Sequence, residues 1–151
     1  MNSNTETLHR ALQSLPHGPE FRFVDRLTSL EPGQRGTGEY RVKGDEYFLR
    51  GHFPGNPIFP GMLLIESAAQ LAGTIGQSDP AIAAMDGLKL TAVRNAKILG
   101  AVRPGETILL QAEITGRLVN LFQASARAFV GEKLILQVEL TLSGEKREGS
   151  K

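Results

Sequence analysis

The stretch from residue 60 to residue 76, PGMLLIESAAQLAGTIG, most constrains what this chain can fold into. Pro60 suits the first position of a helix, and residues 62–65 follow as four large apolar side chains in succession. Four consecutive residues occupy the whole circumference of a helix, which has about 3.6 residues per turn. A helix that is apolar all round is buried rather than laid on a surface. We therefore predict one substantial helix at the centre of the fold.

Several other segments can cover that helix, because they alternate apolar and polar residues. Alternation with a period of two is typical of strands that bury one face. The clearest strands predicted in this way are residues 108–114, 122–130 and 134–142. Further strands are predicted at 21–30, 35–43 and 88–99, with Pro32-Gly33 between the first two and Gly131-Glu132-Lys133 as a short hairpin turn. Near the N-terminus, Leu8, Ala11, Leu12 and Leu15 predict a short amphipathic helix that Pro16 ends.

These elements predict an α+β fold in which a curved antiparallel sheet wraps around one long central helix. Both the sheet and the helix must bury apolar faces, and wrapping one around the other satisfies both. No linker or repeat divides the chain, so residues 1–151 are expected to form a single domain. We expect its ordered core to span about residues 5–143, with mobile termini.

Composition excludes several classes of protein. The net charge of +1 gives no electrostatic case for binding nucleic acid. The chain has no cysteine, which rules out disulfides, thiolate metal sites and a cysteine nucleophile, and fits a cytoplasmic location. No apolar run approaches the ~20 residues of a membrane span, and the polar start MNSNTETLHRALQSL does not resemble a signal peptide.

His52 and Glu66 are the candidate catalytic residues, because they alone titrate near neutrality within residues 51–73. A lone histidine in a loop is usually a hydrogen-bonding or surface residue, and we assign His9 and His17 that role. Glu66 does not fit a solvated role, since it follows four large apolar residues on a helix predicted to be buried. Burying a charged carboxylate costs several kcal/mol unless it is paired or protonated. Such groups are concentrated at functional sites.

The start of the central helix is a candidate oxyanion site. The first turn of a helix has unpaired N–H groups and the positive end of the helix dipole. Gly61 has no side chain, so a ligand oxygen can approach its N–H closely. The prolines before the helix restrict the backbone around His52. A base, an acid and an oxyanion donor would then serve one small substrate.

The segment GHFPGNPIFPGMLLIESAAQ (51–70) resembles the signature of the bacterial 3-hydroxyacyl-acyl-carrier-protein dehydratases, the FabZ/FabA type. LPHGPEFRFVDR (15–26) and AKILGAVRPGETILL (96–110) are similar to further parts of that family, so the resemblance covers about residues 12–142. A glutamate at position 66 resembles the FabZ branch, whereas the isomerising FabA branch has aspartate. The resemblance implies the hot-dog fold, a sheet wrapped around one long helix.

The resemblance also implies roles for individual residues. His52 matches the catalytic histidine, Glu66 the catalytic acid, and Gly61 the glycine whose N–H polarises the thioester carbonyl. The residues that we assign to substrate binding are Phe53, Pro60, Met62, Gln70 and Ile98. Ile98 stands where the family usually has phenylalanine, and residues 76–87, which help gate the acyl tunnel in the family, are short and small here. Chain-length preference is therefore left open.

The implied reaction converts a (3R)-hydroxyacyl thioester to a trans-2-enoyl thioester in fatty-acid synthesis. His52 is expected to act as the general base and Glu66 as the general acid, kept protonated by burial and oriented by Gln70. His52 alone could instead shuttle the proton while Glu66 holds water. No metal or organic cofactor is required.

The expected partners are an acyl carrier protein and a second copy of the chain. Carrier proteins are acidic, and residues 87–105 contain basic but no acidic residues. The candidate docking residues are Lys89, Arg94, Lys97 and Arg103. A solvated strand face explains the same residues equally well. The family resemblance implies a homodimer in which His52 of one subunit works with Glu66 of the other, and a trimer of dimers is also open.

Three alternatives remain at this point. A hot-dog thioesterase would hydrolyse an acyl thioester with a carboxylate and water. A MaoC-type hydratase is disfavoured, because its Asp-then-His order is absent. A non-catalytic acyl-binding module would have no reason to keep both His52 and Glu66.

Overall fold

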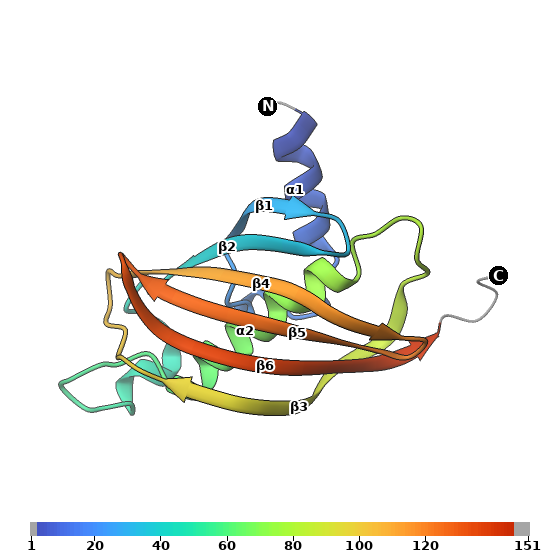
Figure 1. The fold of residues 1–151 in the computed structure, drawn as a ribbon. Helices are drawn as coiled ribbons and strands as arrows, with labels where there is room; N and C mark the ends of the chain where they lie inside the picture. The colour runs from blue at the N-terminus through green and yellow to red at the C-terminus, as the bar shows by residue number, and fades with distance from the viewer. Residues whose placement is uncertain (1–2, 147–151) are drawn as a thin grey trace.

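The computed structural model describes residues 3–146 (Figure 1). Two α-helices are present in this range, α1 (Ser3–Gln13) and α2 (Gly61–Gly76), with short 3-10 helices η1 (Pro19–Phe21) and η2 (Tyr47–Arg50). The strands are β1 (Arg26–Glu31), β2 (Arg35–Arg41), β3 (Met85–Ile98), β4 (Thr107–Leu118), β5 (Leu121–Val130) and β6 (Lys133–Lys146). No helix in the described range is long and apolar enough to cross a membrane.

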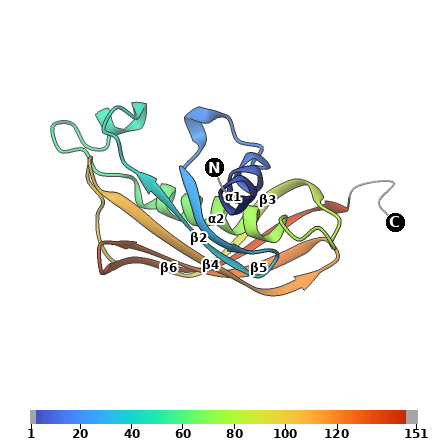
Figure 2. The ribbon, with the colours of Figure 1, turned by 90° about the horizontal axis from the view of Figure 1, so that it is seen from above.

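The six strands form one sheet in the order β1-β2-β4-β5-β6-β3, and every neighbouring pair is antiparallel. The sheet curves along α2, while α1 stands beside β1 and α2 (Figures 1 and 2). Leu64, Leu71 and Ile75 of α2 are at most 1% exposed. The predicted α+β fold, a curved antiparallel sheet around a central helix, is confirmed, and with it the hot-dog arrangement.

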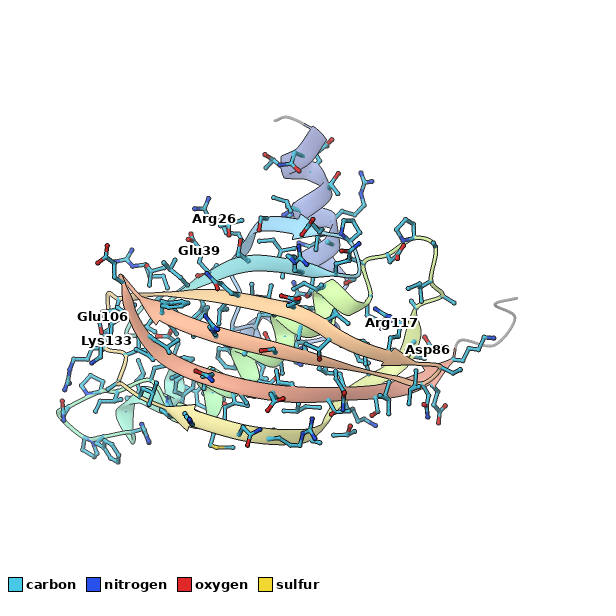
Figure 3. The ribbon with its side chains drawn as sticks, viewed as in Figure 1. Arg26, Glu39, Asp86, Glu106, Arg117 and Lys133 are labelled. Carbon is cyan, nitrogen blue, oxygen red and sulfur yellow. The ribbon has the colours of Figure 1, made fainter. Side chains whose placement is uncertain are left out.

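The concave face of the sheet is apolar because the predicted alternation holds in its central strands. β5 contributes four buried residues at every second position, Phe122, Ala124, Ala126 and Ala128. The small alanine side chains let α2 approach the backbone of β5, and larger residues of β4 and β6 fill the space on either side. Polar side chains lie on the other face, where Arg26 of β1 pairs with Glu39 of β2 at 2.6 Å (Figure 3).

The prediction of a strand over residues 21–30 is wrong at its start, because β1 begins only at Arg26. Residues 21–23 are instead bound by side chains of α2. Gln70 accepts a hydrogen bond from Phe23 N and donates one to Phe21 O, and Ser67 donates to Phe23 O. These hydrogen bonds occupy backbone N–H and C=O groups of residues 21–23 that would otherwise pair with a neighbouring strand.

Other predicted boundaries shift by a few residues. Pro60 is the residue before α2 rather than its first helical residue, because its ψ of 134° is extended. The hairpin turn consists of Gly131 and Glu132 alone, since Lys133 already pairs with Val130. β6 runs to Lys146, beyond the predicted core boundary at 143, and α1 starts at Ser3. The expected mobility of the termini otherwise concerns residues 1–2 and 147–151, which lie outside the described residues.

Candidate functional site

A groove of about 900 Å³ runs beside α2, and polar residues of this helix and its C-cap residue line it. Glu66, Gln70, Thr74 and Gln77 follow one another at spacings of four, four and three residues, which makes a polar stripe along the helix, and all four line the groove. The opposite wall comes from the link after α1, including Leu15 and His17, and from the start of β3. The polar stripe on an otherwise buried helix is therefore the floor of a cavity large enough for a small organic ligand.

Glu66 is held by two neighbours at the same carboxyl oxygen. Gln70, one helical turn further on, donates from Nε2 to Oε2 at 3.0 Å. His17 Nε2 lies 3.4 Å from the same oxygen. The Glu66 side chain is 25% exposed, so within a single chain it is less buried than the sequence predicts. Its exposed part faces the groove.

Gln70 has no polar atom left for a substrate in this arrangement. Its side chain is 2% exposed, its oxygen accepts from Phe23 N, and its nitrogen donates to Phe21 O and Glu66 Oε2. A side-chain amide has two N–H donors, and both are used. Gln70 thus orients Glu66 and anchors residues 21–23.

His52 is fixed by the loop that precedes α2. Its Nδ1 lies 2.9 Å from Ile58 O, and its ring stacks on that of Phe53 with 4.2 Å between centroids. A carbonyl oxygen can only accept, so Nδ1 must carry the hydrogen of this bond. In the neutral ring Nε2 then has a free lone pair, which is the state that a general base requires. His52 does not line the groove that contains Glu66.

The start of α2 presents an unused donor. No side chain caps the helix, and within residues 3–146 Gly61 N–H has no acceptor, whereas the N–H groups of Leu63 and Leu64 both donate to Pro60 O. Ile98, at the end of β3, packs directly on Gly61, since a Cβ added there would lie 2.9 Å from Ile98 Cδ1. Only glycine fits this contact without displacing Ile98.

The remaining residues assigned to substrate binding lie at the same end of α2. Phe53, Met62 and Ile98 are 50%, 70% and 47% exposed, and Pro60 is half-buried. Their part in substrate binding stays a prediction. Among the described residues, no group of three or more His, Cys, Asp or Glu side chains is placed to hold a metal ion.

The four basic docking candidates are exposed along β3 and the loop after it. Lys89, Arg94 and Lys97 lie on β3, and Arg103 donates from Nη1 to Asn56 Oδ1 at 2.7 Å. Asn56 belongs to the same loop as His52, so Arg103 is bonded to the loop that carries the predicted catalytic histidine. Arg94 pairs in register with Glu139 of β6, which places an acidic residue beside it.

β3 is an open edge of the sheet. Within residues 3–146 it pairs only with β6, and residues 91–99 are all exposed, among them Val93, Ile98 and Leu99 at 41–51%. An edge strand has unpaired backbone donors and acceptors that can join a strand of another chain. Apolar residues on such an edge favour association over solvation.

Comparison with known proteins identifies the family. Residues 15–139 match the FabA-like domain family. This chain belongs to the FabA-like family. Proteins named 3-hydroxyacyl-[acyl-carrier-protein] dehydratase FabZ from Syntrophotalea carbinolica, Chloroflexus aggregans and Lawsonia intracellularis are 37%, 35% and 35% identical to it. These alignments cover 85%, 89% and 93% of this chain and 88%, 92% and 94% of the relatives, so the resemblance found in the sequence is confirmed.

Solved structures support the fold alone. The dehydratase heterocomplex ApeI:P from Xenorhabdus doucetiae matches with a TM-score of 0.75 at 16% identity, over 88% of this chain and 89% of that one. Zebra fish thioesterase superfamily member 2 matches with a TM-score of 0.65 at 20% identity, over 89% and 91%. A FabA-like fold is thus shared with proteins whose names indicate different reactions, and the reaction must be argued from the site.

The loop that leads to His52 depends on Glu46. Tyr40 Oη donates to Glu46 Oε2 at 2.6 Å, and the N–H groups of Lys43 and Gly44 donate to the same carboxylate. Partial burial opposes the charge of Glu46, but these hydrogen bonds outweigh it and hold its pKa below the usual 4.5. Burial and the bond to Glu46 raise the pKa of the Tyr40 hydroxyl well above its usual value.

We predict that Glu46→Gln destabilises the protein by about 1–3 kcal/mol at pH 7, the usual contribution of hydrogen bonds to a charged group. Because the pKa of Glu46 is lower in the folded state, its contribution is present above the unfolded value near 4.5 and is lost as the pH falls through the folded value. Urea unfolding at several pH values should show the difference from wild type shrinking in acid. Glu132→Gln, in the exposed hairpin turn, serves as the control. A difference independent of pH would contradict this role.

Proposed function

We propose that this protein removes water from (3R)-hydroxyacyl thioesters on an acyl carrier protein, giving trans-2-enoyl thioesters for fatty-acid synthesis. The observation that carries the proposal is the placement of Glu66. Its carboxyl accepts a hydrogen bond from Gln70 and faces a groove on a helix that is otherwise buried. The FabZ names of relatives that match most of the chain support the same reaction.

In the proposed mechanism the reaction starts at the α-carbon. His52 Nε2 takes the α-proton, and the electron pair of the C–H bond moves into the thioester carbonyl to form an enolate. Gly61 N–H donates to the enolate oxygen, a contribution of about 3–4 kcal/mol for one oxyanion donor. The enolate then collapses to the C2–C3 double bond as the C3–O bond breaks.

Glu66 completes the reaction by giving its proton to the departing hydroxyl, which leaves as water. The enzyme then holds a protonated His52 and an ionised Glu66, and a proton transfer from the one to the other restores both groups. Each step uses only these two side chains and one backbone N–H. The protein's own residues therefore balance the protons of the reaction.

The two halves of this site are proposed to come from two subunits. His52 does not line the groove of Glu66 in its own chain, while β3 beside that groove is an open edge of the sheet with Val93 and Ile98 exposed. Pairing of two β3 edges around a two-fold axis would satisfy the unpaired backbone groups of both edges. It would also form two identical sites, each with His52 from one chain and Glu66 from the other.

We expect His52→Ala and Glu66→Gln each to lower kcat/KM by at least ~100-fold, the scale of losing a general base or acid. The assay follows enoyl thioester formation from a 3-hydroxybutyryl thioester by ultraviolet absorbance, with thiol release measured in parallel. His9→Gln, on the exposed face of α1, is the matched histidine control. Near-wild-type activity in either variant would remove the role assigned to that residue, and thiol release without enoyl formation would indicate a thioesterase.

Docking of the acidic carrier is proposed at the basic residues of β3 and the loop after it. We predict that reversing Lys97 and Arg103 to glutamate raises KM for carrier-bound substrate much more than KM for a pantetheine thioester, because exposed charges steer partners rather than perform chemistry. Arg127→Glu, exposed on β5, is the charge-matched control. Equal effects on both substrates, or no effect on either, would indicate that these residues form a solvated strand face without a docking role.

A further inference from the structure

His17 lies against the proposed catalytic acid, although the sequence alone assigns it only the hydrogen-bonding or surface role that is usual for a lone histidine. Its Nε2 is 3.4 Å from Glu66 Oε2, its side chain is 29% exposed, and its ring stacks on Phe21 with 6.3 Å between centroids. Both His17 and Glu66 line the same groove. A titratable side chain that touches the acid and faces the substrate cavity is placed to affect the chemistry.

The backbone around His17 is held in place. Arg22 donates from Nε to His17 O at 2.8 Å and from Nη2 to Leu15 O at 3.0 Å. Leu15 itself is buried in the core at 7% exposure. Since Arg22 holds the carbonyl groups of both Leu15 and His17, the imidazole is presented to Glu66 by an anchored segment of the chain.

The surroundings of the ring indicate which nitrogen carries the hydrogen. His17 Nδ1 is buried and has no hydrogen-bond partner in the part of the chain that the structure describes. A buried N–H without an acceptor is rarer in proteins than an acceptor without a donor. The neutral tautomer with hydrogen on Nε2 is therefore favoured, and it directs a donor toward Glu66 Oε2.

We propose that His17 is a positioning residue that, together with Gln70, fixes which oxygen of Glu66 carries the transferable proton. This inference rests on the proposed dehydratase function. Gln70 reaches Oε2 from the same helix and His17 reaches it from the opposite wall of the groove. A protonated carboxyl has one carbonyl oxygen, which accepts, and one hydroxyl oxygen, which donates. Two donors at Oε2 define it as the carbonyl oxygen and leave the proton on Oε1.

The separation of 3.4 Å is longer than a closed hydrogen bond. Contacts between catalytic groups are often long before substrate binds and shorten in the complex. In that complex His17 would keep the Glu66 carboxyl from rotating, so that Oε1–H points at the departing hydroxyl. Loss of His17 should then lower the rate of proton delivery more than the affinity for substrate.

A double-mutant cycle tests this role, because a residue that acts through Glu66 has nothing to act on once the acid is gone. We expect His17→Leu to lower kcat about 10-fold, a fraction of the ~100-fold loss expected for removing the acid, with KM within about 2-fold. His17→Gln should stay within about 3-fold of wild type, since its amide N–H can replace Nε2–H. In the Glu66→Gln background, His17→Leu should cause no further loss.

Thermal unfolding of each variant and the His9→Gln control separate positioning from folding. A fall in kcat of the same size in both backgrounds, or no fall with His17→Leu, would overturn the positioning role while the dehydratase function stands. If the wild type forms no enoyl thioester, the proposed function fails and this role with it. Long-range ¹H–¹⁵N spectra of the histidine rings add a readout free of activity. They should show His17 as the Nε2–H tautomer, and the Nδ1–H tautomer would contradict the proposal.

Discussion

The arrangement of the site depends on the hydrogen bonds of one buried amide, that of Gln70. Helix α2 is apolar over most of its circumference and must be covered there, yet it carries a line of polar side chains that an apolar sheet cannot cover. Leaving the amide of Gln70 buried without partners would cost about 1–3 kcal/mol for each group. The backbone of residues 21–23 provides those partners, with Phe23 N and Phe21 O each bonded to the amide.

The hydrogen bonds between Gln70 and residues 21–23 affect both the chain before β1 and the carboxyl of Glu66. Residues 21–23 leave the sheet, so the chain before β1 lies along α2 and carries His17 to the carboxyl of Glu66. The second N–H of the Gln70 amide goes to Glu66 itself. The contact that stabilises the buried helix is therefore also the contact that orients the proposed acid.

The spacing of apolar residues predicted those helices and strands that depend on residues close together in the sequence. The central helix follows from residues 62–65, and the strands of the last third follow from strict alternation, as on β5. The start of β1 was not predictable in this way, because the groups that bind Phe23 lie 44 and 47 positions along the chain. Glu66 stood out because apolar residues surround it in sequence. His17 did not, because its partner is on another element, and only the similarity of LPHGPEFRFVDR to the family marked the segment.

His52 does not line the groove of Glu66 in its own chain, so the proposed site takes one group from each of two subunits. Inactive His52→Ala and inactive Glu66→Ala proteins should be unfolded together and refolded in equal amounts. Random pairing makes half of the dimers mixed, and with shared sites each mixed dimer has one site that lacks both groups and one that is intact. Activity should recover to about a quarter of wild type by this symmetry argument. No recovery in a sample with verified mixed dimers would contradict the shared site.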